Sequence, residues 1–429
     1  MKIIRLVLPL IFLASSFGTH AQSFQNEITL PSKQYMLEGV ANEMYVQTFL
    51  KRPTLGDVTV RFGGSAGYAT GGHTEKKGVV DKPVSGESIE IEMVSLIDFS
   101  VVDSATSEIV AGKPFTGEQE VRVQFLGDSF TKGNYFKSAF LESGYIPNVK
   151  LIGTREVPEY AGQFYEGRGG WTLAKYFSDM PGESLFYNPY YQPEGEYRYW
   201  GNSGFWKTVV ELKKNPKADF SIRYNCDGYD ASGFGEDGKR EAPQKGDMMY
   251  DSSEKYYILW SGKRWQRVEK PEAWRFDFAK YLDMWGLDAP QFLVVMLGLN
   301  DFRDLEMPLD FTEWNAMAEE LLASYKSAVP QGRLLLCTPC TSCGTLNNEK
   351  GDFTIKQNAA MWEVRKNIIQ NFDCRESDGV YVVDASITID NENGYNMKNG
   401  LQVGNPHPYP SYPALGVPIA AFVQYYRNN

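Results

Sequence analysis

Val121-Arg-Val-Gln-Phe-Leu126 runs directly into Gly127-Asp-Ser-Phe130, and this junction decides how the second part of the chain is interpreted. The apolar residues before Gly127 predict a buried β-strand. Gly-Asp-Ser marks a turn, after which helical periodicity begins. Because open α/β folds bind ligands at the carboxyl ends of their strands, Ser129 is expected at a functional edge of a sheet.

Four further apolar runs of strand length follow along the chain. They cover residues 149–152, 292–297, 333–336 and 380–384. Apolar residues recur at helical spacing between and after them, in the stretches 314–325, 359–368 and 414–426. Strands that alternate with helices predict a parallel sheet with helices on both sides, which is an α/β fold.

Residues 22–118 show a different pattern. Short runs rich in β-branched and aromatic residues are separated by Gly, Pro, Asp and Ser, at 44–50, 58–62, 88–94 and 99–102. This spacing predicts a small all-β sandwich domain. We place its boundary with the α/β domain, residues 119–429, in the stretch 111–118.

An aromatic-rich interval at about 180–275 interrupts the alternation of strands and helices. Six of the nine Trp lie between Trp200 and Trp285, and residues 256–265 have the pattern of a hairpin. We interpret this interval as an insertion in the α/β domain. Its aromatic rings suit stacking on sugar rings, but large aromatic side chains mostly pack in cores. Most of them are therefore expected to form core and a few to contact a ligand.

The first 21 residues have the features of a secretory signal peptide. Lys2 and Arg5 precede an apolar run at 6–13, and cleavage is expected after about Ala21. This run is too short to span a bilayer, and no later stretch reaches the ~20 apolar residues of a membrane helix. We expect an exported protein, periplasmic or secreted, with no membrane insertion.

Composition excludes several classes of function. The 429 residues carry a formal net charge of −11, and nucleic-acid binding normally requires a basic face. A chain of this length with 42% hydrophobic residues is expected to fold into more than one domain. The three His exclude a His-rich metal site. One of them lies in the signal peptide and His73 is expected on the surface of the β-domain, which leaves His407.

Three more segments add to the chemistry that Ser129 could perform. A serine hydroxyl needs a base to become a nucleophile, and amide donors must stabilise the oxyanion that forms. Gly170 lies in the glycine-rich segment Glu-Gly-Arg-Gly-Gly-Trp-Thr, where a backbone amide can approach a substrate closely. Asn300 follows the strand at 292–297, and His407 lies in Pro-His-Pro before the terminal helix. Each has an ordinary structural interpretation alone, but the four in this order indicate a hydrolytic site.

These blocks resemble those of the SGNH (GDSL-like) hydrolase superfamily, which is named after a Ser, a Gly, an Asn and a His. Here they are Ser129, Gly170, Asn300 and His407. The resemblance covers roughly residues 119–429. It implies a three-layer α/β/α, flavodoxin-like fold and ester hydrolysis without a metal or an organic cofactor. It also implies that Ser129 is the nucleophile, that His407 is the base, and that the Ser129 and Gly170 amides and the Asn300 side chain form the oxyanion hole.

The last block departs from the family's Asp-x-x-His pattern, because Gly404 stands where the acid is usual. That acid orients the imidazole and stabilises its protonated form. Asp384 and Asp390 are possible substitutes by chain position alone; a carbonyl or a more distant side chain is the alternative. Some carbohydrate esterases of this superfamily lack the acid and carry an N-terminal β-sandwich, which is similar to the layout here.

The sequence therefore predicts an exported serine esterase that removes acyl groups, in the first place acetyl, from a carbohydrate. Trp171 and Asp128, which adjoin the Gly170 and Ser129 positions, are expected to contact the substrate. One alternative is a catalytically impaired glycan-binding protein with the same fold, which the missing acid favours. The other is a lipase or thioesterase of the same superfamily, which we rank lower because no long apolar lid is visible.

Cysteine spacing leaves a further question open. Cys337, Cys340 and Cys343 are spaced as in metal-binding motifs, whereas Cys226 and Cys374 are distant in sequence. Because exported proteins usually oxidise their cysteines and no His lies nearby, we expect a disulfide rather than a metal site. With five Cys, at least one thiol is free or pairs with another molecule.

Overall fold

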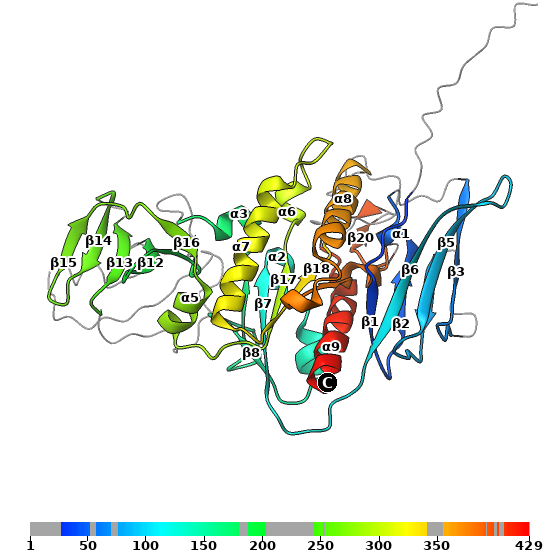
Figure 1. The fold of residues 1–429 in the computed structure, drawn as a ribbon, viewed down its shortest axis with the longest axis horizontal. Coiled ribbons are helices and arrows are strands. Elements are labelled where there is room, and N and C mark those ends of the chain that lie inside the picture. The colour runs from blue at the N-terminus through cyan, green and yellow to red at the C-terminus, as the bar shows by residue number, and fades with distance from the viewer. Residues whose placement is uncertain are drawn as a thin grey trace, which may run out of the picture.

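The computed structural model describes residues 27–51, 57–69, 76–179, 188–202, 244–251, 254–340, 355–391, 393–398, 401–402 and 407–428. Figure 1 shows a central group of helices and strands between two smaller groups of strands. One of these groups is N-terminal, and the other comes from the aromatic-rich interval. None of the described helices is long and apolar enough to cross a membrane.

The central sheet has seven strands within the described residues, in the order β19-β18-β17-β7-β10-β9, with β8 also paired to β7. All pairs are parallel except β9 with β10. The five runs expected as strands are confirmed, and they form the neighbours β19, β18, β17, β7 and β8. The strands are β7 (Val121–Gly127), β8 (Val149–Ile152), β9 (Arg155–Glu156), β10 (Phe164–Gly167), β17 (Phe292–Met296), β18 (Arg333–Cys337) and β19 (Val380–Val383).

Burial explains why the long apolar runs became strands of this sheet. Every residue of β17 and of β19 is buried, as expected for parallel strands that are covered on both faces.

The three helical stretches are also confirmed. They are the long helices α7 (Thr312–Ala328), α8 (Ile355–Phe372) and α9 (Tyr412–Asn428). The shorter elements are α2 (Ser129–Lys132), η1 (Ser138–Glu142), α3 (Leu173–Tyr176), α5 (Phe278–Trp285), α6 (Leu299–Phe302), η5 (Glu376–Asp378), η6 (Ala385–Thr388), β20 (Met397–Lys398), β21 (Leu401–Gln402) and η7 (Tyr409–Ser411).

The N-terminal residues form a four-stranded sheet, in the order β1-β6-β5-β3, and a two-stranded sheet of β2 and β4. The strands are β1 (Lys33–Leu37), β2 (Asn42–Tyr45), β3 (Val58–Gly64), β4 (Lys77–Val80), β5 (Ser88–Ser95) and β6 (Val101–Gly112). The expectation of one strand over 44–50 is wrong, because β2 ends at Tyr45 and α1 (Val46–Phe49) follows. Val46 and Phe49 lie three residues apart, so a helical turn buries both side chains on one side.

β1 lies between two apolar cores. Tyr35 and Leu37 pack in the core of the central region, whereas Met36 packs in the N-terminal core, because successive side chains of a strand point to opposite faces. The ring of Tyr35 meets that of Phe422 in α9 edge to face, with the ring centroids 4.8 Å apart. At Gly112 of the neighbouring β6, a Cβ atom would lie 2.2 Å from a backbone oxygen of α9. Only glycine therefore lets this strand approach the helix so closely.

The aromatic-rich interval contributes a four-stranded sheet, in the order β12-β13-β14-β15, and a pair of strands, β11 and β16. The hairpin expected at 256–265 is confirmed, since β14 and β15 pair antiparallel with Trp260 opposite Trp265. Tyr199, Met248 and Tyr257 form a small core here, so these aromatic rings pack against one another as expected. The strands are β11 (Tyr191–Pro193), β12 (Arg198–Asn202), β13 (Asp247–Asp251), β14 (Tyr256–Trp260), β15 (Trp265–Val268) and β16 (Trp274–Phe276).

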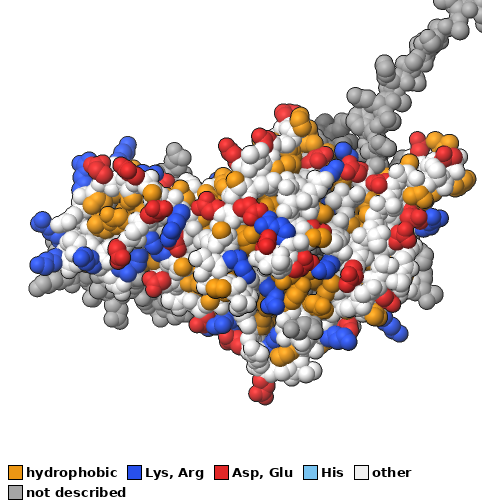
Figure 2. Space-filling view, viewed as in Figure 1, with side chains coloured by type: hydrophobic (Ala, Val, Ile, Leu, Met, Phe, Trp, Pro, Cys, Tyr) orange, Lys and Arg blue, Asp and Glu red, His pale blue; other side chains and the backbone are white. Residues whose placement is uncertain are grey.

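The turn between β5 and β6 exposes large apolar side chains. Figure 2 shows hydrophobic atoms gathered at this end of the hairpin, at the upper right, where Ile97 is 80% exposed and Phe99 is 77% exposed. Two backbone hydrogen bonds close the turn, from Ser95 N to Ser100 O (2.9 Å) and from Phe99 N to Ser95 O (3.0 Å). The turn is therefore well hydrogen-bonded although its side chains are unburied.

Candidate active site

Ser129 is the first residue of α2, directly after β7. Asp128 caps this helix, since its Oδ1 accepts a hydrogen bond from Phe130 N (2.9 Å). A Cβ atom at Gly127 would lie 2.6 Å from the backbone oxygen of Met296 in the neighbouring strand. The junction therefore requires glycine, and it leaves Ser129 partly exposed at the carboxyl end of the parallel strands.

Gly170 lies in the loop that follows β10, the strand next to β7. Gly167 pairs with Gly127 across the two strands, and Arg168 N donates a hydrogen bond to Gly127 O (2.8 Å). The loop therefore begins beside the turn that carries Ser129. Gly170 itself is exposed, with a left-handed φ of 72° and open space where a side chain would point. Its surroundings leave room for a ligand to approach the backbone.

A buried ion pair, which sequence reasoning missed, lies where the Gly170 loop begins. Glu166 and Arg168 are both fully buried, with 2.5 Å between the charged atoms. The Glu166 carboxylate also accepts hydrogen bonds from Tyr281 Oη (2.8 Å) and Thr154 N (2.6 Å). The one sign of the pair in the sequence is two opposite charges on either side of Gly167.

Replacing Glu166 with Gln is expected to lower the free energy of unfolding by about 3 kcal/mol. The amide keeps the shape of the side chain but leaves the buried Arg168 guanidinium without its counter-charge. Urea unfolding should show a lower midpoint with an unchanged slope. Glu159→Gln is the matched control, since Glu159 is exposed. Equal midpoints in the two variants would show that the buried pair does not stabilise the fold.

Asn300, in α6, joins the segments that carry Ser129 and Gly170. Its Nδ2 donates hydrogen bonds to the backbone oxygen of Trp171 (3.1 Å) and to Asp128 Oδ2 (3.3 Å). These contacts bring together residues from three distant stretches of the chain. Three of the four blocks that the sequence singled out are thus linked at one end of the central sheet.

The Asn300 amide has two N–H groups, and both have an acceptor in the structure. The hydrogen bond to Asp128 is the longer of the two. Burial raises the pKa of Asp128 to about 7, and the Asp301 carboxylate acts in the same direction, against the N–H of Phe130. Asn300 therefore has one shorter hydrogen bond, to the Trp171 backbone, and one longer hydrogen bond, to a buried carboxyl group whose pKa is raised.

Asp301 fixes the position of α6 relative to α3. Its carboxylate accepts hydrogen bonds from Leu173 N (2.8 Å) and from Gly298 N (3.1 Å). Burial raises the pKa of Asp301 to about 6, although these backbone donors act in the opposite direction. The side chain thus anchors the helix that presents Asn300.

His407 lies just before α9, and its ring packs against Phe130, the residue after Ser129. The ring centroids are 4.7 Å apart and the planes differ by 32°. Among the described residues, no hydrogen bond joins His407 to Ser129. Burial lowers the pKa of His407 to about 4, and the Arg303 guanidinium acts in the same direction. The imidazole is therefore neutral at neutral pH, which is the form a general base requires.

The hydrogen-bond partner of His407 Nδ1 is the hydroxyl of Tyr412, a residue that sequence reasoning missed. Its signal in the sequence is a hydroxyl-bearing residue five positions after the histidine, at the start of the terminal helix. Gly404, which departs from the Asp-x-x-His pattern, lies outside the described residues, as does His73.

Asp384 does not lie against His407, which corrects its suggested role as the orienting acid. Its carboxylate forms a fully buried, two-pronged ion pair with Arg365. It also accepts hydrogen bonds from Thr338 Oγ1 (2.8 Å) and Gln34 Nε2 (3.2 Å). These partners bind Asp384 into the core between the central sheet and the N-terminal strands.

The expectation that Trp171 and Asp128 contact the substrate is also corrected. The Trp171 indole is completely buried, with the Tyr176 ring 4.8 Å away and the Arg168 guanidinium 5.2 Å away. Asp128 is 1% exposed and serves as the helix cap. Both residues act inside the protein, and the Trp171 backbone oxygen holds Asn300 in place.

The described cysteines form no disulfide with one another. Cys337 and Cys340 are buried thiols and Cys374 is exposed, so the expected disulfide is not formed between Cys337 and Cys340. Burial raises the pKa of both buried thiols, which keeps them protonated and unreactive. Cys226 and Cys343 lie outside the described residues. In the part of the chain that is described, no group of three or more His, Cys, Asp or Glu is placed to hold a metal ion.

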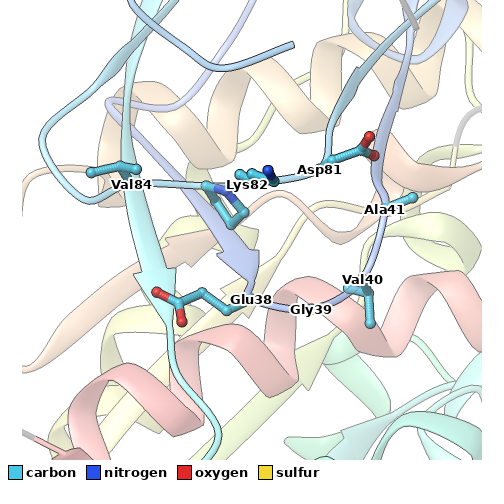
Figure 3. Close-up of a pocket in the computed structure, with 8 residues that line it drawn as sticks. Glu38, Gly39, Val40, Ala41, Asp81, Lys82 and Val84 are labelled. Carbon is cyan, nitrogen blue, oxygen red and sulfur yellow. The ribbon is translucent and has the colours of Figure 1, made fainter. Parts of the chain in front are cut away.

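A cavity of about 590 Å³ opens in the N-terminal region, away from Ser129. Figure 3 shows Glu38, Asp81 and Lys82 around it, together with Val40 and Val84. Its lining contains no serine, histidine or cysteine. None of the four candidate residues Ser129, Gly170, Asn300 and His407 lines it.

Comparison with known proteins gave no match to any protein-family model and no match to any curated protein. Three similar solved structures are carbohydrate esterases. One belongs to family 3 and comes from Talaromyces cellulolyticus (12% identity, 72% of this chain, 99% of that chain, TM-score 0.33). The second is a family 2 enzyme with a carbohydrate binding domain from Corynascus thermopiles (Myceliophthora fergusii) (13% identity, 92% of this chain, 95% of that chain, TM-score 0.34). The third is a family two enzyme from Clostridium thermocellum in complex with cellohexaose (13% identity, 92% of this chain, 94% of that chain, TM-score 0.31). Similarities this remote carry no argument about the function of this chain.

Proposed function

We propose that this protein is a serine esterase that removes acyl groups, in the first place acetyl, from a carbohydrate. The observation that carries the proposal is the set of contacts around Ser129. Asn300 hydrogen-bonds to the cap of the Ser129 helix and to the Gly170 loop, and the His407 ring packs on Phe130. These contacts support a site in which the proposed nucleophile, base and oxyanion donors come from four distant segments of the chain.

In the proposed reaction, Ser129 Oγ attacks the ester carbonyl carbon while His407 Nε2 accepts the hydroxyl proton. The amides of Ser129 and Gly170 and the side chain of Asn300 donate hydrogen bonds to the oxyanion. His407 then gives the proton to the sugar oxygen, and the C–O bond of the ester breaks. Water attacks the acyl-enzyme by the same route and releases the acid.

The first step requires Ser129 and His407 to form a hydrogen bond. We propose that this contact forms when substrate binds, since catalytic hydrogen bonds often tighten only in the complex. The partly exposed Ser129 and the position of His407 beside Phe130 support this.

The carbohydrate part of the proposal rests on the aromatic-rich interval and on the predicted export. Tyr191 and Trp274 are partly exposed and stack with 5.7 Å between their ring centroids and 20° between their planes. They lie on the paired strands β11 and β16, which hold both rings in place. Such a pair offers an apolar face of the kind that a sugar ring covers.

We also propose the domain organisation that the sequence predicts. Residues 119–429 would form a three-layer α/β/α hydrolase domain with an insertion at about 180–275, residues 22–118 a β-sandwich domain, and residues 1–21 a signal peptide. The parallel central sheet supports the first of these. A separate apolar core, made almost entirely by residues 28–111, supports the second.

A fluorophosphonate, which labels activated serine nucleophiles, tests the proposed function. The label is expected on Ser129 by peptide mass spectrometry, and it should abolish acetate release from an acetylated oligosaccharide. Acetate release that survives complete labelling of Ser129 would refute the proposal. A series of acyl chain lengths extends the test, since a preference for long acyl groups would identify a lipase or thioesterase instead.

A glycan-binding protein without catalysis is the second candidate, and one observation favours it. His407 has a neutral phenol as its partner where serine hydrolases usually have a carboxylate. Calorimetric titration with acetylated and deacetylated oligosaccharides separates the two candidates. Binding without any acetate release would establish the second.

The pH profile of hydrolysis should reflect the low pKa of His407. With this pKa lowered from 6.5 to about 4, the base stays neutral and kcat/KM should persist down to about pH 5. Because the unfolded chain binds this proton more readily, the contribution of His407 to stability falls as pH drops from about 6.5 towards about 4. Circular dichroism must therefore confirm folding at each pH. An acid limb near pH 6.5 in folded protein would contradict the prediction.

A further inference from the structure

The hydrogen bond between His407 Nδ1 and the Tyr412 hydroxyl lies inside the protein. The two side chains are 8% and 7% exposed. The turn η7 connects them, with hydrogen bonds from Tyr409 N to His407 O (2.9 Å) and from Ser411 N to Pro408 O (2.9 Å). A short, hydrogen-bonded segment therefore sets the distance between the imidazole and the phenol.

Two further aromatic rings pack against this pair. Phe130 lies 4.7 Å from the His407 ring and 5.8 Å from the Tyr412 ring, centroid to centroid. Tyr409 lies 5.4 Å from His407 and 5.3 Å from Tyr412. Rings on both members restrict rotation of the imidazole about its side-chain bonds, so the Nδ1 contact is held in one geometry.

Tyr412 also contacts the helix that begins at Ser129. Gly133 caps the carboxyl end of this helix, and a Cβ atom there would lie 2.7 Å from Tyr412 Cε2. The phenol ring thus fills the space that a side chain at position 133 would occupy. One residue therefore touches both the candidate base and the helix of the candidate nucleophile.

The charged groups nearby do not replace Tyr412. Asp384 is paired with Arg365, and Asp128 accepts from Phe130 N and Asn300. No carboxylate hydrogen-bonds to His407 among the described residues. The charge that acts on His407 is the Arg303 guanidinium, which disfavours a second positive charge.

We propose that Tyr412 is the positioning residue of His407 and takes the place of the missing acid. Its hydroxyl oxygen accepts the Nδ1 proton, which leaves the lone pair of Nε2 free to receive the proton of Ser129. The phenol thus selects the tautomer and orientation that a carboxylate selects in other serine hydrolases. Burial raises the pKa of Tyr412, so the phenol remains neutral and adds no negative charge to stabilise the imidazolium. The catalytic part rests on the proposed function; the tautomer of His407 does not.

Nitrogen-15 NMR of the histidine side chains tests the tautomer directly. The chain has only three His, and His407→Gln assigns the signal. In the wild type, Nδ1 should give the signal of a protonated ring nitrogen and Nε2 that of an unprotonated one. In Tyr412→Phe the two forms should mix. A wild-type spectrum with the proton on Nε2 would overturn the proposal, even if the variant failed to fold.

Kinetics supply the second measurement. Tyr412→Phe keeps the ring contacts and removes only the hydroxyl, so kcat for a small acetyl ester should fall about 10- to 100-fold, with KM changed less than about twofold. Tyr409→Phe is the matched control, since its ring packs against the same pair, and it should match the wild type. Unchanged kcat in folded Tyr412→Phe, beside an inactive Ser129→Ala, would overturn this inference alone. Full activity in Ser129→Ala would instead refute the proposed function and leave the tautomer assignment to the spectra.

Discussion

Ser129→Ala is expected to lower kcat/KM for a small acetyl ester by at least about 1000-fold while the protein stays folded. The substitution removes the proposed attacking atom, and the proposed oxyanion donors alone would support only slow attack by water. Ser129 is partly exposed at the first position of α2, and Asp128 provides the cap of that helix. Loss of the hydroxyl should therefore leave the fold intact. Initial rates and a melting curve for each protein provide the measurement.

Ser138→Ala is the matched control for this variant. Ser138 is also partly exposed in a short helix of the same region, and within the described residues its hydroxyl donates a hydrogen bond only to the exposed Glu142. Its activity should equal that of the wild type. Comparable rates for Ser129→Ala and Ser138→Ala would remove Ser129 from the mechanism.

The second large effect separates His407 from Asp384. His407→Ala should lower kcat per folded molecule by about 1000-fold, because it removes the proposed base. Asp384→Asn should lower the free energy of unfolding by about 3–5 kcal/mol, since Arg365 would remain buried beside a neutral amide. Its kcat per folded molecule should stay within about threefold of the wild type, because its contacts lie away from His407.

Urea unfolding measures the free energy of unfolding of each variant, and initial rates give kcat. The folded fraction from the unfolding curve corrects each rate, so a loss of folded protein is not mistaken for a loss of kcat. If Asp384→Asn kept wild-type stability and lost activity as His407→Ala does, Asp384 would serve the imidazole after all.

The strands that could be predicted from the sequence are those that consist of a run of mainly apolar residues. β17 and β19 are apolar and buried throughout, and this pattern is visible in their own residues. β9 has two residues and β10 consists of Phe-Tyr-Glu-Gly, so neither strand contains an apolar run of strand length. The prediction of one strand over residues 44–50 is wrong because one helical turn and a short strand have similar apolar patterns.

The sequence predicts the blocks of the candidate site but not the contacts between them. The sequence places Ser129 and Asn300 after predicted strands, and parallel strands bring such ends together. Whether Trp171 faces solvent depends on Tyr176 and Arg168, which surround its indole. The partner of His407 likewise depends on the path of η7, which no local pattern specifies. Side-chain direction in loops is thus the part of the site that required the structure.

The packing of β1 against two apolar cores determines when this strand can complete its folding. Tyr35 in β1 rests on Phe422 in α9, so one of the first described strands is covered by the last described helix. A chain that emerges from the ribosome with its N-terminus leading cannot complete this contact until α9 has emerged. Until then the face of β1 that packs against α9 stays exposed to water. A truncated chain without α9 would expose this apolar face to other chains, which favours aggregation.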